Sequence, residues 1–395
     1  MSQCRTFRYQ LIPTAKQADR LTRMLALQCE LYNAALEERR GVWKVEQRTV
    51  NYFEQCRELT TLKEVRPEVL EFGVTLCRGT LKRLDRAYAA FFRRCRAGET
   101  PGFPRFRSRQ RFDALQWEDT NGWRIKTDVS RLRIHGLGEV KIRLHRELRG
   151  LPKAITVKRE GRRWYLSVRC VEVPRALLAP TGREVGVDLG ARELVATSDG
   201  ALCGAPRFAA HGAQGLARAQ RDLASKQRGS NRRARSVARV AAHHRKVRNQ
   251  RHNHAHQLSR WLINEYDLIV IEDLSISQMV RRPRARPLAD GTHDANGAAA
   301  KSGLNRTILD AGWAELLAML AYKAEDAGRE VVAVNPRGTS QRCARCGHTD
   351  KKNRLSREAF HCVKCAHSAH ADLNAACNIL RAGRALRASA RVGSN

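Results

Sequence analysis

Two short apolar runs that each lead into an acidic residue constrain this sequence more than any other feature. The first covers residues 184–190 and contains Asp188, and the second covers residues 268–271 and leads directly into Glu272. Short runs rich in Val and Ile are typical of buried β-strands. A third acid, Asp372, opens a helical pattern near the end of the chain. Three acids arranged in this way predict a metal site built on one β-sheet.

Each of these acids has an ordinary structural interpretation when it is taken alone. An Asp at a strand end often forms a turn, and Glu272, Asp273 and Asp372 could each cap a helix. Together, clustered carboxylates can hold two hard cations about 4 Å apart, which stabilise the attacking and leaving oxygens of a phosphoryl displacement. We therefore expect Asp188, Glu272 and Asp372 to be the metal ligands of a nuclease. Asp273 is expected to cap a helix or to support the site.

The charge of the chain favours a polyanionic partner. The sequence has 74 Lys and Arg residues against 39 Asp and Glu residues, which gives a formal net charge of +35. Each cation placed on a phosphate releases a bound counterion, so this excess favours nucleic acid. A merely solubilising surface is the alternative, but a charge this large repels itself when no partner is present.

Length and composition indicate several intracellular domains. The chain has 395 residues, of which 42% are hydrophobic, enough to form the cores of more than one domain. The sequence contains no apolar stretch approaching the roughly 18 residues that cross a membrane, and residues 1–5 lack the apolar core of a signal peptide. We therefore expect a cytoplasmic protein with reduced thiols and no membrane partner.

Two CxxC pairs predict one structural zinc site. Cys343 and Cys346 form the first pair, and Cys362 and Cys365 form the second. Each CxxC turn presents two thiolates to one ion, and four thiolates complete a closed tetrahedral shell. A redox dithiol is the alternative, but it does not need two evenly spaced pairs. Cations crowd around both pairs, which suits a zinc ribbon that grips nucleic acid.

The N-terminal part of the chain predicts a strand, a helical bundle and a set of short strands. Residues 4–12 form the first strand, and helical periodicity over residues 14–97 predicts a bundle whose third helix runs from Pro67 to Arg96. Short strands follow within residues 112–173. They suggest a small β-barrel, which the first strand could join.

The loop at residues 98–111 interleaves aromatic and cationic side chains. Its rings could stack on bases while its cations meet phosphates, a combination that suits RNA or single-stranded DNA. The alternative is an ordinary basic loop held down by Phe103 and Phe106. The contact residues expected here are Phe103, Arg105 and Arg107.

A strongly basic helical segment, residues 211–265, is the best candidate for a helix that faces nucleic acid. Its Val and Leu residues could form an inner face. A solvated basic helix is the alternative. The contact residues expected here are Arg232, Arg233, Arg235, Arg239, Arg245 and Lys246.

The remaining segments surround the second apolar run. Residues 279–307 are rich in Arg, Pro, Gly and Ala and predict a mobile loop, and residues 308–327 predict an amphipathic helix. A strand is expected over residues 329–334. The last helix should begin near residue 371 and fray after Arg384.

Taken together, the motifs resemble the TnpB family of insertion-sequence-encoded proteins, which have a RuvC-like nuclease domain and are related to the type V CRISPR effectors. The resemblance covers nearly the whole chain. It is carried by residues 186–190 (GVDLG), 271–274 (IEDL), 339–347 (TSQRCARCG) and 372–376 (DLNAA), with weaker similarity over 7–14 and 102–106.

The resemblance implies an α+β multidomain fold. A β-barrel wedge domain would contain an inserted helical recognition domain, and an RNase H-like (RuvC) α/β domain with an inserted zinc ribbon would follow. The implied boundaries are 1–13 and 112–173 for the wedge domain, 14–111 for the recognition domain, 183–338 and 368–384 for the nuclease domain, 339–367 for the zinc ribbon that binds target nucleic acid, and 385–395 for a flexible tail.

The resemblance also implies RNA-guided cleavage of DNA next to a short transposon-adjacent motif. The catalytic acids of the family fall on Asp188, Glu272 and Asp372, which would bind two Mg²⁺ or Mn²⁺ ions, and its zinc ligands fall on the four CxxC cysteines. The implied partners are a guide RNA encoded by the element, double-stranded target DNA and the displaced single strand, in a prokaryotic cytoplasm and at the nucleoid. The alternatives are a compact type V CRISPR-effector-like nuclease, a nuclease-inactive guided DNA-binding repressor and a DNA transposase.

Overall fold

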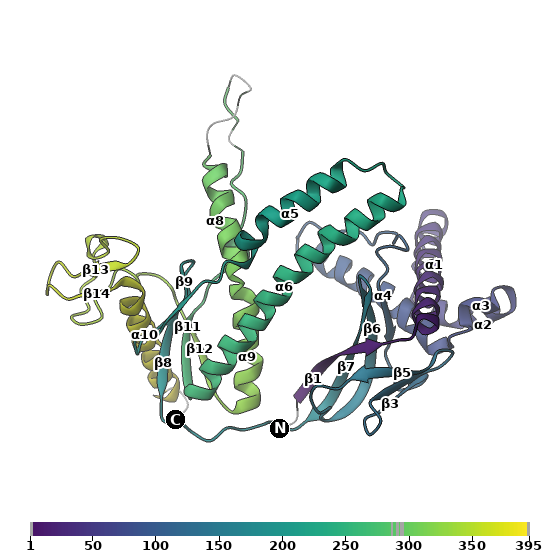
Figure 1. Ribbon diagram of the computed structural model, residues 1–395, viewed down its shortest axis with the longest axis horizontal. Helices are drawn as coiled ribbons and strands as arrows, with labels where there is room; N and C mark the ends of the chain where they lie inside the picture. Colours follow the sequence, from purple (N-terminus) through teal and green to yellow (C-terminus); the bar gives the residue numbers. More distant parts are fainter. Residues whose placement is uncertain (1–2, 286, 290–291, 293–295, 393–395) are drawn as a thin grey trace. The chain divides into compact units, whose positions relative to one another are not determined.

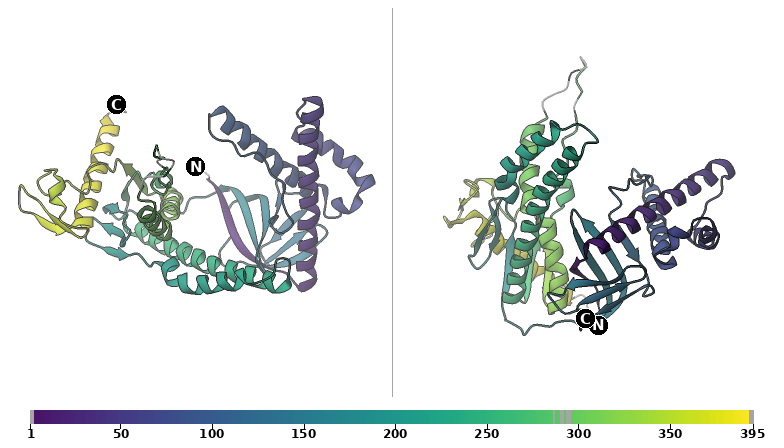
Figure 2. Two further views of the ribbon diagram at one scale, coloured as in Figure 1. Left: turned by 90° about the horizontal axis from the view of Figure 1, so that it is seen from above. Right: turned by 45° about the vertical axis from the view of Figure 1, so that its right-hand side comes forward.

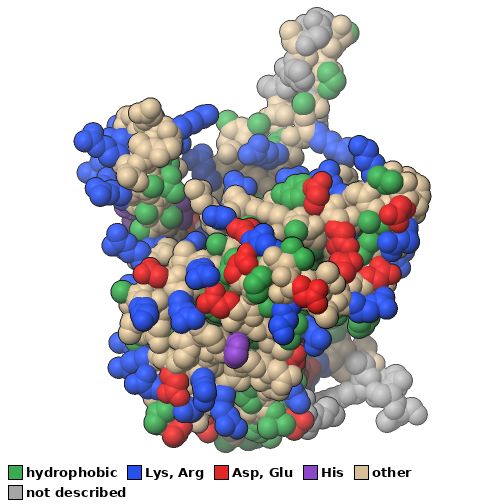
Figure 3. Space-filling model, turned by 90° about the vertical axis from the view of Figure 1, so that its right-hand side faces the viewer, with side chains coloured by type: hydrophobic (Ala, Val, Ile, Leu, Met, Phe, Trp, Pro, Cys, Tyr) green, Lys and Arg blue, Asp and Glu red, His purple; other side chains and the backbone are tan. Residues whose placement is uncertain are grey.

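The computed structural model describes residues 3–285, 287–289, 292 and 296–392, and the chain divides into two units, Met1–Pro174 and Arg175–Asn395. No helix among the described residues combines the length and apolar character that a membrane span needs. Lys and Arg side chains are spread over the face drawn in Figure 3, with Asp and Glu side chains between them. The excess of cations is therefore visible at the surface of the protein.

The first unit is built on a seven-stranded sheet that contains the N-terminal strand (Figure 1). The strand order is β2-β6-β7-β1-β5-β4-β3, and every neighbouring pair is antiparallel. The first strand lies between β7 and β5, so the expectation that it joins the later strands is confirmed. The bounds are β1 (Gln3–Ile12), β2 (Ala114–Trp117), β3 (Trp123–Lys126), β4 (Arg131–Ile134), β5 (Gly138–Arg143), β6 (Leu151–Glu160) and β7 (Arg163–Val173).

Four helices separate β1 from β2: α1 (Ala15–Glu46), α2 (Tyr52–Val65), α3 (Pro67–Leu70) and α4 (Val74–Arg96). Helix α1 starts with a capping box between Thr14 and Gln17, whose side chains each accept from the backbone N–H of the other residue. The prediction of one helix from Pro67 to Arg96 was wrong, because the helix is interrupted before α4 at Gly73, which has a φ of 93°. A glycine with a left-handed φ ends a helix at little cost.

The second unit is built on a five-stranded mixed sheet with the order β10-β9-β8-β11-β12. Strands β8, β11 and β12 are parallel, and β9 and β10 continue from β8 as antiparallel neighbours. The bounds are β8 (Glu184–Asp188), β9 (Glu193–Thr197), β10 (Leu202–Gly204), β11 (Leu268–Glu272) and β12 (Glu330–Val334).

The described residues of this unit form six α-helices: α5 (Phe208–Ala224), α6 (Asn231–Glu265), α7 (Ile276–Met279), α8 (Ala298–Ala311), α9 (Trp313–Ala327) and α10 (Ala371–Val392). Helices α5 and α6 lie side by side and form a long helical hairpin (Figures 1 and 2). The basic segment 211–265 is therefore two helices rather than one. Helix α10 continues past Arg384 to Val392, into the segment expected to be a tail.

The prediction of a loop over residues 279–307 was wrong in part. Helix α8 begins at Ala298, and only Gly312, with a φ of 72°, separates it from α9. Alanine has the highest helix propensity, so an Ala-rich run can form a helix in spite of the Gly and Pro nearby. Residues 286, 290, 291 and 293–295 of the expected loop lie outside the described residues.

The two faces of the second sheet are covered by different helices. Val185 and Val187 on β8 and Ile269 on β11 pack in one core with residues of α6 and α9. The opposite face carries α10, because Val270 packs with Ile379 there. A Cβ on Gly186 would lie 2.1 Å from the carbonyl oxygen of Ala376, so only glycine lets α10 approach β8 this closely.

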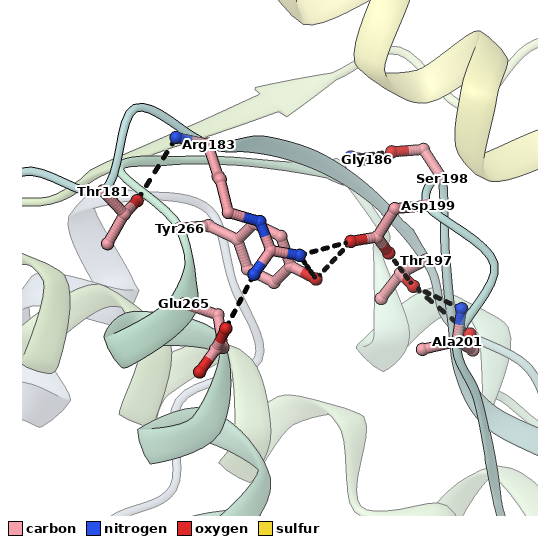
Figure 4. Close-up of polar contacts among 9 residues, drawn as sticks. All are labelled: Thr181, Arg183, Gly186, Thr197, Ser198, Asp199, Ala201, Glu265 and Tyr266. Carbon is pink, nitrogen blue, oxygen red and sulfur yellow. Dashed lines mark hydrogen bonds and ion pairs between the residues drawn. The ribbon is translucent and has the colours of Figure 1, made fainter.

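A polar network fixes the strand starts at the end of the sheet opposite the acids (Figure 4). Arg183, just before β8, contacts Glu265 at the end of α6 at 2.7 Å and Asp199 after β9 at 2.9 Å. The Tyr266 hydroxyl donates to the same Asp199 carboxylate at 2.6 Å. Burial, followed by this hydrogen bond, raises the pKa of Tyr266. The network ties β8, β9 and the start of β11 together.

Candidate functional site

The register of the sheet brings two of the three acids together. Strands β8 and β11 are parallel neighbours, and Val187 pairs with Ile271. Asp188 and Glu272 are the next residues on each strand, so they lie side by side where the strands end. Side chains alternate between the faces of a strand. Since Val187 and Ile271 face α6 and α9, both acids point to the face that α10 covers.

The third acid arrives on that face from α10. Asp372 lies in the first turn of this helix, directly after the cysteine-rich segment. Its Oδ2 atom lies 3.9 Å from the position that a Cβ on Gly190 would occupy, in the loop that follows Asp188. The structure therefore brings together the three acids that the sequence singled out.

The three carboxylates interact electrostatically. Burial, and after it the charges of Glu272 and Asp372, raise the pKa of Asp188 from its ordinary value of 3.8 to about 7, although Arg354 acts in the opposite direction. Burial also raises the pKa of Glu272. Crowded, buried carboxylates favour a proton or a cation. This donor set fits hard divalent cations, which prefer oxygen ligands.

Two further side chains contact the acids. The Thr339 hydroxyl donates to Oε1 of Glu272 at 2.6 Å, and Nη2 of Arg354 lies 3.2 Å from Oδ1 of Asp372. Arg354 is itself held by the carbonyl oxygens of Ser356 and Arg357. Sequence reasoning did not assign either residue to the site. The only available signal was their position inside or beside the cysteine-rich motif.

The four cysteines form a compact cluster. Their Sγ atoms all lie within 4.8 Å of one another, with Cys343 3.7 Å from Cys365 and Cys346 3.6 Å from Cys362. Tetrahedral zinc with Zn–S bonds of about 2.3 Å requires sulfur atoms about 3.8 Å apart. The cluster therefore fits one tetrahedral metal ion.

The two CxxC turns have the same backbone geometry. The backbone N–H of Cys343 donates to the backbone carbonyl oxygen of His348, and that of Cys362 donates to the backbone carbonyl oxygen of His367, both at 2.9 Å. The residue after each pair has a left-handed φ, which is 76° at Gly347 and 54° at Ala366. The second turn therefore places an alanine where the first places a glycine.

The cysteines and the acids differ in spacing. In the part of the chain that the structure describes, the cysteines are the only group of three or more His, Cys, Asp and Glu side chains close enough to share one ion. Asp188, Glu272 and Asp372 do not form such a group.

The helical hairpin uses two of its six expected contact residues internally. Arg233 donates to the carbonyl oxygens of Leu223 and Lys226 at the end of α5, and Arg239 pairs with Asp222 at 3.2 Å. These guanidinium groups stabilise the turn between the helices. The other four side chains are exposed or half-buried along α6: Arg232, Arg235, Arg245 and Lys246.

The loop at residues 98–111 is held against the helices of the first unit. The Asn33 side chain bonds both the N–H and the carbonyl of Arg107, each at 2.8 Å. The rings of Phe103 and Phe106 nevertheless remain 46% exposed. The alternative in which these rings merely hold the loop down therefore accounts for only part of their surface.

Comparisons with known proteins place the chain in a family. The family model described as "Probable transposase" (OrfB_IS605) matches residues 168–282, and the model described as "Cas12f1-like, TNB domain" matches residues 313–379. A model described as "Helix-turn-helix domain" matches residues 1–48, where the structure has strand β1 and the single helix α1.

Two relatives match over nearly the whole chain. "Putative RNA-guided DNA endonuclease InsQ" from Escherichia coli is 33% identical over 98% of this chain and 94% of its own length. "Putative RNA-guided DNA endonuclease" from Streptomyces pristinaespiralis is 32% identical over 97% of this chain and 90% of its own length. The chain therefore belongs to the TnpB family.

Among solved structures, the mini-RNA-guided endonuclease CRISPR-Cas_phi3 matches with a TM-score of 0.45 and 11% identity, over 97% of this chain and 92% of that chain.

Proposed function

We propose that this protein is an RNA-guided DNA endonuclease of a transposable element, which cleaves target DNA next to a short adjacent motif by metal-dependent phosphodiester hydrolysis. The observation that carries the proposal is the convergence of Asp188, Glu272 and Asp372 at the ends of two parallel strands and the start of α10. Full-length relatives that bear the name of RNA-guided DNA endonucleases support it.

The acids would hold two Mg²⁺ or Mn²⁺ ions, and the four cysteines would hold one Zn²⁺. Two such cations, when bound, stabilise the attacking and leaving oxygens of an in-line displacement. Thr339 fixes the orientation of the Glu272 carboxylate through its hydroxyl group. Arg354 keeps a positive charge beside Asp372, where a phosphodiester would also lie.

The two units suggest a division of labour. We assign the sheet of the first unit to a wedge domain, with the helices between β1 and β2 as an inserted recognition domain. We assign the mixed sheet of the second unit to a RuvC-like nuclease domain, with the cysteine-rich segment as an inserted zinc ribbon. The cationic surface would hold the guide RNA and both DNA strands through their backbones, while base pairing selects the target.

The first test is to purify the protein from cells that carry its native flanking DNA and to sequence the RNA that accompanies it. A discrete, abundant RNA from the edge of the element supports guidance. That RNA should then direct cleavage of a matched target in Mg²⁺, and Asp188→Ala should abolish cleavage while Asp273→Ala retains it. Random RNA that salt removes would contradict the proposal and leave an unguided nucleic-acid binder or a transposase.

A further inference from the structure

A large cavity in the first unit has an aromatic lining, of which only Phe103 has been assigned a contact role above. Its volume is about 1230 Å³, and its walls come from the second half of α1, residues 49–51, the second half of α4 and the loop at residues 98–111. Ligand pockets of roughly 300–1,000 Å³ accept small molecules, so this cavity has room for more than one ring system. The aromatic residues that line it are Trp43, Tyr88, Phe91, Phe92, Phe103 and Phe106.

The rings in this cavity are accessible. Trp43 is 52% exposed, and Phe92 and Phe103 are each 46% exposed. Phe103 is held in place by edge contacts with Tyr88 and Phe91, whose ring centroids lie 5.7 and 5.1 Å away. Aromatic surface that is both fixed and exposed marks a binding site more often than ordinary surface does.

A buried guanidinium group in the cavity wall lacks one hydrogen-bond partner. Arg39 is only 7% exposed, its Nε donates to Gln55 at 2.9 Å, and its Nη1 lies 3.6 Å from Asp85. Its Nη2 is buried without a partner. The guanidinium carbon of Arg39 also lies 5.2 Å from the centroid of the Tyr88 ring, so Arg39 helps to hold this ring in the cavity wall.

Further cations adjoin the cavity. Arg40 lies 5.2 Å from the centroid of the Phe106 ring, and Lys44 also lines the cavity. Arg94 reaches to within 3.9 Å of the position that a Cβ on Gly102 would occupy. Accessible rings beside cations suit a ligand that has flat bases and phosphates.

We infer that this cavity binds unpaired bases of the guide RNA, with the bases stacked on its rings. The inference rests on the proposed function, which supplies an RNA that stays bound. Proteins recognise RNA mainly through splayed bases that stack on aromatic side chains and Arg planes. A resident ligand also keeps an exposed apolar patch from promoting aggregation.

The test measures RNA binding by the full chain. A single-stranded RNA of about twelve nucleotides, with 4-thiouridine at several positions, is titrated in roughly 0.5 M salt, where phosphate contacts are weakened. Trp43→Ala and Phe92→Ala should each weaken binding by about 5- to 100-fold, as the loss of base stacking predicts. The dependence of affinity on salt should not change, because neither variant removes a cation. Photocrosslinks should map to α1, α4 and the loop.

The control is Phe53→Ala. Phe53 is 73% exposed on α2 and does not line the cavity, so its variant should bind RNA as the wild type does. Equal affinities for the wild type and Trp43→Ala, together with crosslinks elsewhere, would overturn the inference. So would an equal loss of affinity in Phe53→Ala, or a DNA oligonucleotide that crosslinks to the cavity as well as RNA does. A dimer that Trp43→Ala dissociates without loss of RNA binding would assign the cavity to self-association.

The two proposals can fail separately. If the purified protein carries no discrete RNA and cleaves no guided target while crosslinks still map to the cavity, the proposed function fails and the cavity remains an RNA site of another kind. If guided cleavage is observed but Trp43→Ala leaves RNA affinity and crosslinks unchanged, the nuclease stands and the cavity inference falls.

Discussion

Replacing Asp188 by Asn removes one of three crowded negative charges and keeps the size of the side chain. Burial, Glu272 and Asp372 raise the pKa of Asp188 from 3.8 to about 7 in the metal-free protein. Because the folded pKa lies above the unfolded one, ionisation of Asp188 destabilises the folded state, and this penalty grows between about pH 4 and pH 7. A shift of about three units, at about 1.4 kcal/mol each, sets an upper bound of roughly 4 kcal/mol.

We therefore expect Asp188→Asn to raise the unfolding free energy of the second unit at pH 8 without metal, and to lose this advantage near pH 4. Chemical unfolding, monitored by circular dichroism, measures this difference in unfolding free energy. In Mg²⁺ the wild type should be more stable than the variant, because Mg²⁺ binds the folded site of the wild type and stabilises the variant much less. Asp273→Asn, at an exposed neighbouring carboxylate, is the matched control and should change stability by less than about 0.5 kcal/mol. A variant less stable than the wild type at pH 8 in EDTA would refute the reasoning.

Four further variants test other parts of the site. Ala366→Gly should stabilise the metal-loaded protein by about 1 kcal/mol in thermal unfolding, because alanine is strained at a φ of 54°; a lower melting temperature would count against strain there. Cys362→Ser should remove the single zinc ion detected by native mass spectrometry, and retention of that ion would disprove the four-thiolate site. Thr339→Val should lower the guided cleavage rate about tenfold by releasing the Glu272 carboxylate, while Thr339→Ser restores it and RNA content stays constant. An unchanged rate in Thr339→Val would remove the positioning role.

The local sequence was sufficient to place Asp188 and Glu272, because their positions follow from the geometry of the two strands that they end. Asp188 and Glu272 follow buried β-branched runs, and parallel strands in register bring their carboxyl ends together. The four cysteines were likewise predictable, since two CxxC turns have few other uses. The site roles of all seven residues remain predictions, whereas their proximity is observed.

Tertiary contacts were the part that the sequence did not reveal. The sequence near Arg354 does not indicate that this residue forms an ion pair with Asp372. The contact depends on the intervening segment, which folds back through β13 (Ala359–His361) and β14 (Ser368–His370). Hydrophobic periodicity also ran unbroken across Gly73, where a left-handed φ ends one helix and starts another. Similarly, charge patterning could not separate Arg233, which caps α5, from the cations that remain exposed.

The central claim is tested most directly by cleavage of a DNA duplex that carries a sequence matched to the co-purified RNA beside a randomised flank. The protein–RNA complex in Mg²⁺ should cut only duplexes with both the match and one short flanking motif. Mismatches near that flank should prevent cutting. Asp188→Ala should abolish cutting but leave the RNA content of the complex unchanged. Cutting that ignores the RNA match, or that persists in Asp188→Ala, would contradict the account.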